Sequence, residues 1–290
     1  MKYFRPGSLE ELLVVLGNSG ESAKLLAGGT DLMLALRVGR RFGALVNITR
    51  VEQLRGIAQR AGPGRPGVRL GALVTVAELL RSPLIRSSAP LLWQAADRFA
   101  SPLVRSRATV GGNLCNGSPA ADLGLALLAL DARVELESMK GRRTLPIEEL
   151  FRGPGRTAIE PDEVLVAVDF PSQSEGMRSA FEKSGTRPAL EIAVASVAAS
   201  LELRAGRVTS ARIAYGSVAP VPMRGAKVEE LLVGRELTDG LILEAARAAA
   251  AEARPIDDVR GTQVYRRRLV GAFVRRALTA AREERVATHV

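Results

Sequence analysis

Cysteine and histidine are almost absent from this chain. Its 290 residues include one cysteine, Cys115, and one histidine, His289. A single cysteine excludes an internal disulfide and cannot by itself ligate an iron–sulfur cluster or a structural zinc. One histidine beside the C-terminus gives little basis for histidine acid–base or metal chemistry. We therefore predict no metal site and no catalytic side chain, interpret Cys115 as a buried inert thiol, and assign any redox chemistry to a bound cofactor.

Long apolar runs and aromatic residues are also scarce. No window reaches the ~18 uninterrupted apolar residues of a membrane span, and "MKYFRPGSLEELL" lacks the basic start and apolar run of an export signal, so a cytoplasmic protein is expected. The formal net charge is +10, but only three tyrosines and one tryptophan are available to stack on bases. The arginines are spread along the chain. We expect ordinary surface charge and no nucleic-acid binding, with one patch available to an acidic partner subunit.

Length and patterning favour two domains of the α+β class. A chain of 290 residues that is 47% hydrophobic can bury a substantial core. Alternation and apolar spacing predict a strand over 23 to 28, a helix over 30 to 39 and a strand over 43 to 49, which together form a β–α–β unit. The run "GPGRPG" at 62 to 67 breaks this pattern, and a further strand is predicted over 68 to 76.

The middle of the chain combines helices with one polar loop. Residues 77 to 100 have helical spacing interrupted at Pro83 and Pro90, which predicts a helix pair. The run "ATVGGNLCNGSP" at 108 to 119 is typical of a loop, and 122 to 131 returns to helical spacing.

The final third changes character. A strand is predicted over 163 to 171, and "SQSEG" at 172 to 176 is typical of a linker. Residues 191 to 218 alternate as two strands around a turn at 204 to 206, which predicts a sheet followed by helices. These helices are predicted near 226 to 233, 241 to 253 and 262 to 285.

Two diglycine sequences lie next to predicted helices, in "LLAGGTDLM" (25 to 33) and in "VGGN" (110 to 113). Glycine allows positive φ and leaves backbone N–H groups accessible, which is what a diphosphate needs. Neither sequence has the G-x-G-x-x-G or the P-loop spacing. For either one alone, a tight turn without a ligand is the preferred explanation. Asp31 would repel a phosphate, so we expect its carboxylate to face away or to bind a hydroxyl.

Three longer runs resemble one family. The runs "KLLAGGTDLM", "RSRATVGGNLCNGSPAADLGLALLALDA" and "RPIDDVRGTQVYRRRL" resemble the FAD-binding medium subunit of the xanthine dehydrogenase and aerobic carbon monoxide dehydrogenase family of molybdenum hydroxylases. The resemblance covers nearly the whole chain in matching order. It implies a vanillyl-alcohol-oxidase-type FAD-binding domain over 1–173, with subdomains of about 1–60 and 61–173. A C-terminal α+β domain would follow over 177–286.

The resemblance also implies which residues bind FAD. Two loops would hold the pyrophosphate, and the matching residues in this sequence are Leu26, Ala27, Gly28, Gly29, Thr30 and Asp31 in the first loop and Thr109, Gly112 and Asn113 in the second.

Three further residues match positions around the rest of the cofactor. Asp122 would bind ribityl or ribose hydroxyls, since a carboxylate accepts from two neighbouring O–H groups. Lys183 would lie near the isoalloxazine or its pyrimidine edge, where a cation raises the flavin potential. An exposed strand lysine is the alternative. Phe99 would lie against the flavin ring, although an ordinary core phenylalanine is an equal alternative.

The function implied is that of an oxidoreductase subunit. In the family that this chain resembles, a large molybdopterin subunit performs the hydroxylation and a small subunit with two [2Fe–2S] clusters relays electrons. The FAD subunit of this heterotrimer passes them to NAD+, oxygen or a quinone. The alternatives are a stand-alone flavin-dependent oxidase or reductase and, more remotely, a basic nucleic-acid-binding protein. The arginines at 266 to 268 are interpreted as the solvated or interface-facing side of a helix.

Overall fold

The computed structural model describes residues 1–61, 66–174, 176–185 and 192–283. Most of the predicted break at 62 to 67 lies outside these residues, as does His289. The chain forms two compact units by internal packing. The first unit comprises Met1–Arg86, Ala100–Gly117 and Asp131–Ser172, and the second comprises Ser87–Phe99, Ser118–Leu130 and the chain from Gln173 onward. Among the residues that the structure describes, helix accounts for 39% and strand for 29%, which confirms the α+β class.

A small parallel sheet opens the first unit. Its order is β1-β3-β2, with both outer strands parallel to β3, so the predicted β–α–β unit is confirmed. Leucines at helical spacing on α1 pack on this sheet, and the Ser8 hydroxyl caps the helix by accepting from the N–H of Glu11. The elements are β1 (Lys2–Phe4), α1 (Leu9–Ser19), β2 (Ala23–Leu26), α2 (Leu32–Arg37) and β3 (Ala44–Asn47).

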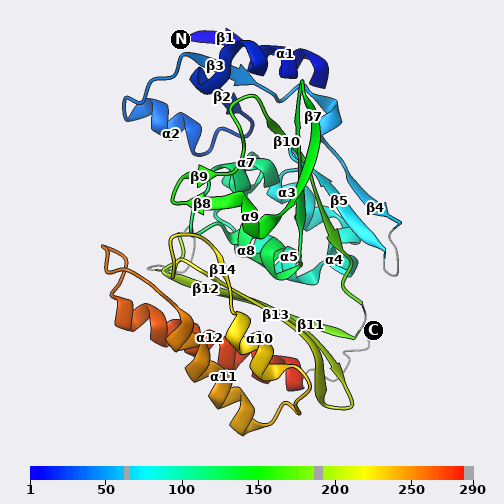
Figure 1. The fold of residues 1–290 in the computed structure, drawn as a ribbon, viewed down its shortest axis with the longest axis vertical. Coiled ribbons are helices and arrows are strands. Elements are labelled where there is room, and N and C mark those ends of the chain that lie inside the picture. Colours follow the sequence, from blue (N-terminus) through cyan, green and yellow to red (C-terminus); the bar gives the residue numbers. More distant parts are fainter. Residues whose placement is uncertain (62–65, 175, 186–191, 284–290) are drawn as a thin grey trace. The chain divides into compact units, whose positions relative to one another are not determined.

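A five-stranded antiparallel sheet forms the rest of the core of the first unit (Figure 1). Its order is β4-β5-β10-β6-β7. On its polar face Arg69 joins Glu135 and Asp169, each at 2.6 Å. The strands are β4 (Ile57–Arg60), β5 (Gly67–Gly71), β6 (Arg133–Ser138), β7 (Gly141–Pro146) and β10 (Val164–Pro171).

The predicted strand over 68 to 76 is wrong in its second half. β5 ends at Gly71, and helix α3 (Val76–Arg81) begins at Val76. A capping box explains the change, because Thr75 accepts from the N–H of Glu78 while the Glu78 carboxylate accepts from the N–H of Thr75. The remaining short elements of the first unit include η1 (Gly20–Ser22), η2 (Glu52–Leu54), α6 (Pro102–Arg105), α9 (Ile147–Leu150), β8 (Phe151–Gly153) and β9 (Arg156–Thr157); α4 (Pro83–Ser88) runs from the first unit into the second.

The second unit is a sheet covered by helices on both faces (Figure 1). Alternate residues of β12, such as Val197 and Ala199, form a core with α10, α11 and α12. Their neighbours face α5 and α8, so β12 is buried on both sides. The elements are α5 (Pro90–Asp97), α8 (Asp122–Ala129), β11 (Met177–Ser184), β12 (Ala195–Arg204), β13 (Arg207–Gly216), β14 (Met223–Arg224), α10 (Ala226–Leu232), α11 (Asp239–Glu252) and α12 (Gln263–Glu283).

The predicted strand pair and the three helices that follow it are confirmed. Prolines start α4 and α5 as the sequence indicated, but α3 precedes them, so residues 77 to 100 contribute to three helices and the predicted helix pair is wrong. Helix α8 begins at the predicted residue. The predicted domain boundary between residues 173 and 177 stays a prediction. It divides the chain into two continuous domains, whereas the two packed units are each built from several separate segments of the chain. Among the described helices, none is both long and apolar enough to cross a membrane.

Candidate functional site

The first glycine loop lies between β2 and α2 and offers bare backbone donors. Gly29 has φ +75°, a conformation that favours glycine. Across the described residues, the N–H groups of Gly28, Gly29 and Thr30 have no acceptor. The loop is half-buried, so these consecutive donors lie in a partly shielded position. Consecutive backbone N–H groups of this kind form an anion-binding nest.

The second glycine pair is not in a loop, and that prediction is wrong. Residues Val110–Cys115 form a short helix, α7, whose cap is Thr109; the Thr109 hydroxyl accepts from the N–H of Gly112 at 3.0 Å. Gly111 donates to the carbonyl of Ala72 at 2.8 Å, so neither glycine has a free amide. A Cβ on Gly111 would lie 2.8 Å from the Cβ of Ala72. Close packing of α7 on the end of β5 therefore explains this glycine.

The two glycine segments meet within the first unit. A Cβ added to Gly28 would lie 1.9 Å from the carbonyl oxygen of Arg107, two residues before the α7 cap. Asn116, at the end of α7, donates to the Asp31 carboxylate at 3.4 Å. Asp31 also accepts from the Thr30 hydroxyl at 3.3 Å. What approaches the backbone of Gly28 is therefore the second glycine segment itself.

Asn116 was not identified from the sequence. Its only sequence signal is its place four residues after Gly112, which puts it one helical turn further along the same face of α7. Because this stretch was predicted to be a loop, the shared helix face of Gly112 and Asn116 was not considered.

Gly112 and Thr109 form the open part of α7. Apart from the backbone of α7 itself, the only described atom within 4 Å of a Cβ on Gly112 would be the Thr109 hydroxyl oxygen, at 2.9 Å. Thr109 is 5% exposed, and its hydroxyl proton has no acceptor among the described residues. Asn113 is half-buried and its N–H donates to the carbonyl of Thr109 at 2.9 Å. Packing within the protein therefore does not account for the missing side chain of Gly112.

We expect Gly28→Ala to destabilise the chain by about 1–3 kcal/mol or more. The added Cβ meets the main-chain carbonyl of Arg107, which cannot rotate away as a side chain would. The thermal unfolding midpoint should fall by several degrees, and flavin binding should fall with it. The matched control is Gly17→Ala, since no atom lies within 4 Å of a Cβ at Gly17. An unchanged midpoint for Gly28→Ala would contradict the close approach of the two segments.

The second unit contains a buried ion pair between two of the predicted cofactor residues. The Lys183 ammonium lies 2.6 Å from the Asp122 carboxylate, and the two side chains are 8% and 7% exposed. The alternative of an exposed strand lysine is therefore wrong. Lys183 Nζ also lies 3.5 Å from the carbonyl of Arg98, and half-buried Phe99 follows directly. Tertiary packing thus brings Asp122 and Lys183 together and places the residue before Phe99 beside them.

One oxygen of Asp122 has no hydrogen-bond partner. Oδ2 is bound by Lys183, whereas Oδ1 is fully buried without a donor among the described residues. Burial raises the pKa of Asp122 to about 6, and Lys183 offsets only part of that effect. A buried carboxylate oxygen without a donor is costly, and ligand hydroxyl groups would satisfy it.

Two glutamines hold α5 against β11, the strand that carries Lys183. Gln94 Oε1 accepts from the N–H of Phe181 at 2.9 Å, and Gln173 donates to the hydroxyls of Ser179 and Ser200 at 2.6 and 3.0 Å. A recess of about 290 Å³ runs along this seam of the second unit. Sequence analysis missed both glutamines, since Gln94 lies within an apolar pattern and Gln173 within the polar run interpreted as a linker, and neither setting reveals a hydrogen-bond partner.

The stability of the apo chain should depend on pH through Asp122. Its pKa of about 6 in the folded chain lies above the usual 3.8, so between these values the folded chain keeps a proton that the unfolded chain has lost. The contribution of this group to the free energy of unfolding therefore falls as pH rises through that window and stays low above it. Denaturant unfolding from pH 4 to pH 8 should show this slope. Asp122→Asn should remove it, and an identical slope in this variant would contradict the raised pKa.

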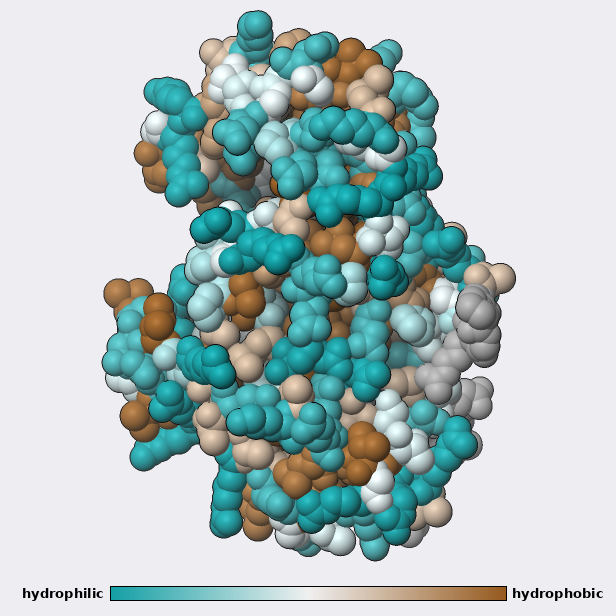
Figure 2. Space-filling view, in the orientation of Figure 1, coloured by the Kyte–Doolittle hydropathy of each residue, from teal (hydrophilic) through white to brown (hydrophobic). Residues whose placement is uncertain are grey.

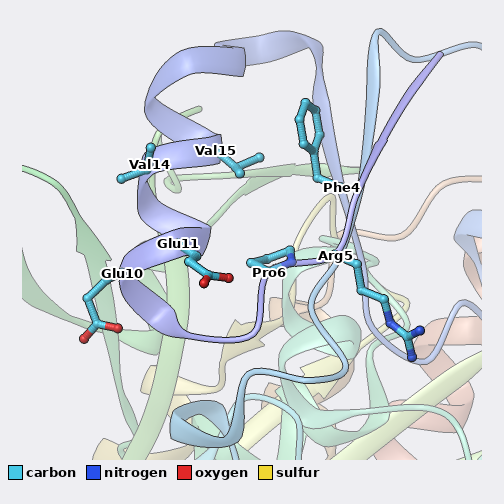
Figure 3. A pocket seen from close by; sticks show the side chains of 7 residues that line it. All are labelled: Phe4, Arg5, Pro6, Glu10, Glu11, Val14 and Val15. Carbon is cyan, nitrogen blue, oxygen red and sulfur yellow. The ribbon is translucent and has the colours of Figure 1, made fainter.

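A second recess lies in the first unit, away from all predicted cofactor residues. It has a volume of about 510 Å³ and lies between the β1 end and α1 (Figure 3). Glu11, one of two glutamates that line it, accepts from the N–H of Gly7 at 2.7 Å and so stabilises the turn into α1. Figure 3 shows Glu11 beside Pro6, with Val14 and Val15 on the next turn. We assign this recess a structural origin.

Cys115 is exposed, which contradicts the prediction of a buried residue, although the atoms around its sulfur raise the pKa of the thiol to about 12, in keeping with an inert thiol. It lies at the end of α7, where the helix turns this position outward. Within the described part of the chain, no group of three potential metal ligands occurs.

Comparison with protein families identifies the class. Residues 1–173 match the model of the FAD-binding domain in molybdopterin dehydrogenase, and residues 179–281 match that of the CO dehydrogenase flavoprotein C-terminal domain. These matches together span most of the chain. Fold and site therefore define a flavoprotein of the molybdopterin dehydrogenase class, and the cofactor is FAD.

Individual relatives narrow this class. The medium chain of carbon monoxide dehydrogenase from Hydrogenophaga pseudoflava is 35% identical over 97% of this chain and 96% of its own length, and a putative xanthine dehydrogenase FAD-binding subunit from Escherichia coli (strain K12) is 32% identical over 96% and 95%. The structure of the Hydrogenophaga pseudoflava enzyme aligns with a TM-score of 0.92 at 35% identity, covering 97% of this chain and 96% of that chain. Quinoline 2-oxidoreductase from Pseudomonas putida 86 aligns with 0.91 at 28% identity, covering 98% and 97%. The chain belongs to the family of FAD-binding medium subunits of the molybdenum hydroxylases, which are oxidoreductases.

The residues present fit FAD. Three bare backbone donors in the first unit suit phosphate oxygens, and the partnerless oxygen of Asp122 in the second unit suits hydroxyl donors. Gly112 leaves the α7 surface open, and the Thr109 hydroxyl has a proton to donate.

Proposed function

We propose that this chain is the electron-transfer subunit of a molybdenum hydroxylase heterotrimer. It would receive electrons from the [2Fe–2S] clusters of a small subunit. A large molybdopterin subunit would supply those electrons to the clusters. It would pass them on to NAD+, oxygen or a quinone. The observation that carries the proposal is the first glycine loop, whose three donors are bare and which packs against the segment before α7. Bound FAD supplies the chemistry of accepting single electrons and releasing two.

The side chains of this protein would bind and tune the cofactor. The N–H groups of Gly28, Gly29 and Thr30 would hold phosphate oxygens, together with the Thr109 hydroxyl. The site residues inferred from the resemblance stay proposals, and among them the structure supports these donors most directly. Because both amides of the α7 glycines are taken, the second segment would contribute through the Thr109 hydroxyl and the bare Gly112 surface.

The buried ion pair would act on the redox end of the cofactor. Asp122 would accept hydroxyl groups through Oδ1 while Oδ2 holds Lys183 in place. Lys183 would then supply a fixed positive charge, which favours the reduced and more negative form of a flavin and raises its potential. Phe99, half-buried beside the Arg98 carbonyl, would complete this group. A cytoplasmic location and the absence of nucleic-acid binding remain sequence-based predictions.

Purification of the chain tests the proposal. The protein should show a flavin absorbance band and release FAD on denaturation. After chemical reduction it should be reoxidised by one of NAD+, oxygen or a quinone, tested in separate reactions. Colourless protein that fails to bind added FAD would refute the proposal. Turnover of a small organic substrate by the isolated chain would instead support a stand-alone oxidase or reductase.

A further inference from the structure

One matched sequence run has no part in the cofactor site. This run, which we call the 254–268 segment, leads from the end of α11 into the first turns of α12 in the second unit. It appears as the orange loop beside α12 in Figure 1. Four apolar or aromatic side chains in it are exposed, and Figure 2 shows brown atoms along the left edge of the molecule in the same place. Their exposed fractions are 66% for Ile256, 103% for Val259, 58% for Val264 and 48% for Tyr265.

The 254–268 segment is firmly held despite this exposure. Arg266 is 4% exposed, donates to the carbonyl of Ser217 at 2.9 Å and pairs with Asp258. The interpretation of residues 266 to 268 as a solvated or interface-facing side is therefore wrong for Arg266 and holds for exposed Arg267 and Arg268. Asp258 and Gly261 exchange two backbone hydrogen bonds, each 3.2 Å long.

Both ends of the segment are fixed as well. The N–H of Arg254 donates to the carbonyl of Val218 at 2.9 Å, and Pro255 is buried. Asp257 accepts from the N–H of Gln263 at 2.5 Å. The fold thus commits a buried arginine and both carboxylates to a loop that presents apolar side chains to water, which folding alone does not explain.

The charge around these apolar side chains is mainly positive. Arg254, Arg260 and Arg268 are exposed, and within the described residues none of them forms an ion pair. The Asp258 carboxylate pairs with Arg266, whereas exposed Asp257 accepts only from the N–H of Gln263 and leaves one negative charge among the arginines. The surface is therefore an apolar centre with a basic rim, which is complementary to an apolar recess bordered by carboxylates.

We propose that the 254–268 segment is the docking surface for another subunit of the complex, which presents an acidic border around an apolar recess. This inference rests on the proposed function, because it takes the chain to work within a complex. A second copy of this chain fits poorly, since a symmetric contact through this surface would place two mainly positive surfaces against each other. Docking covers Ile256 and Val259 and pairs the rim arginines.

The test uses the whole complex, purified through a tag on this chain from cells that produce all of its subunits. Iron, molybdenum and flavin are measured per mole of tagged chain, and the co-purified chains are identified by mass spectrometry. Ile256→Asp and Val259→Asp should each reduce iron and molybdenum at least ten-fold, because they place a carboxylate against an acidic recess. Flavin content and the unfolding midpoint should stay unchanged. Leu243→Asp, on the exposed side of α11 (45% exposed), is the matched control and should assemble normally.

A charge reversal provides an independent measurement. Arg260→Glu should weaken assembly and reduce its dependence on salt, whereas Arg247→Glu on α11 should not. Normal iron and molybdenum in the 256 and 259 variants would overturn the proposal. So would binding of the wild-type chain to phosphatidylserine vesicles or to itself through these residues. Absence of flavin in every form of the chain would instead refute the proposed function. The iron and molybdenum contents would still report whether the subunits assemble.

Discussion

Gly112→Val should abolish FAD binding while leaving the chain folded. The valine Cβ meets only the Thr109 hydroxyl, at 2.9 Å, so the core is not disturbed. The branched side chain covers the open surface of α7 and displaces the hydroxyl that caps the helix. Flavin per mole of chain should fall at least ten-fold, whereas loss of the cap costs about 1 kcal/mol of unfolding free energy. Absorbance of the purified protein and chemical denaturation measure the two effects.

Gly17→Val is the control for this variant. It introduces the same side chain into α1, at a helical glycine with no atom within 4 Å of the added Cβ. This variant should retain full flavin content. Normal flavin in Gly112→Val would show that α7 does not take part in the cofactor site. Loss of flavin together with a cooperative fold would separate binding from folding, which Gly28→Ala cannot do.

Lys183→Met should cost about 3–5 kcal/mol of unfolding free energy at pH 8, because it leaves a buried carboxylate without its counter-ion. Both side chains are less than a tenth exposed, so solvent screens the pair little. The loss should be smaller at pH 5, where protonation neutralises Asp122, whose pKa is already about 6. Denaturant titrations of the apo chain at the two pH values measure the difference. If flavin still binds to this variant, its reduction potential should be lower than that of the wild type.

The double variant Lys183→Met/Asp122→Leu checks the cause. Replacing both partners by apolar side chains removes the unpaired charge, so most of the lost stability should return. Flavin binding should be weaker in the double variant than in the wild type, because the hydroxyl acceptor Asp122 is gone. A double variant as unstable as Lys183→Met would mean that packing around Lys183, and not the ion pair, causes the loss.

Local pattern predicted most of the described elements. The segments that form α8, α10, α11 and α12 have apolar residues at helical spacing. In β12 and β13, apolar and polar residues alternate on either side of a clear turn. Errors occurred where capping decided the structure. Thr75 and Thr109 each begin a helix inside a stretch whose composition is typical of a strand or a loop. A cap depends on one hydroxyl reaching one N–H group, and composition does not reveal this.

The sequence alone determined the class of fold, because periodicity is continuous along each element, and the membership of the flavoprotein family, because three runs of the chain resemble that family. The cofactor-binding residues inferred from that resemblance stay predictions. Tertiary structure decided how those residues meet. It placed Gly28 against the carbonyl of Arg107 and paired Asp122 with Lys183 across 61 positions, and it packed Ser87–Phe99 and Ser118–Leu130 with the C-terminal sheet. Such contacts arise from the burial of surfaces that are distant in the chain, so no local pattern contains them.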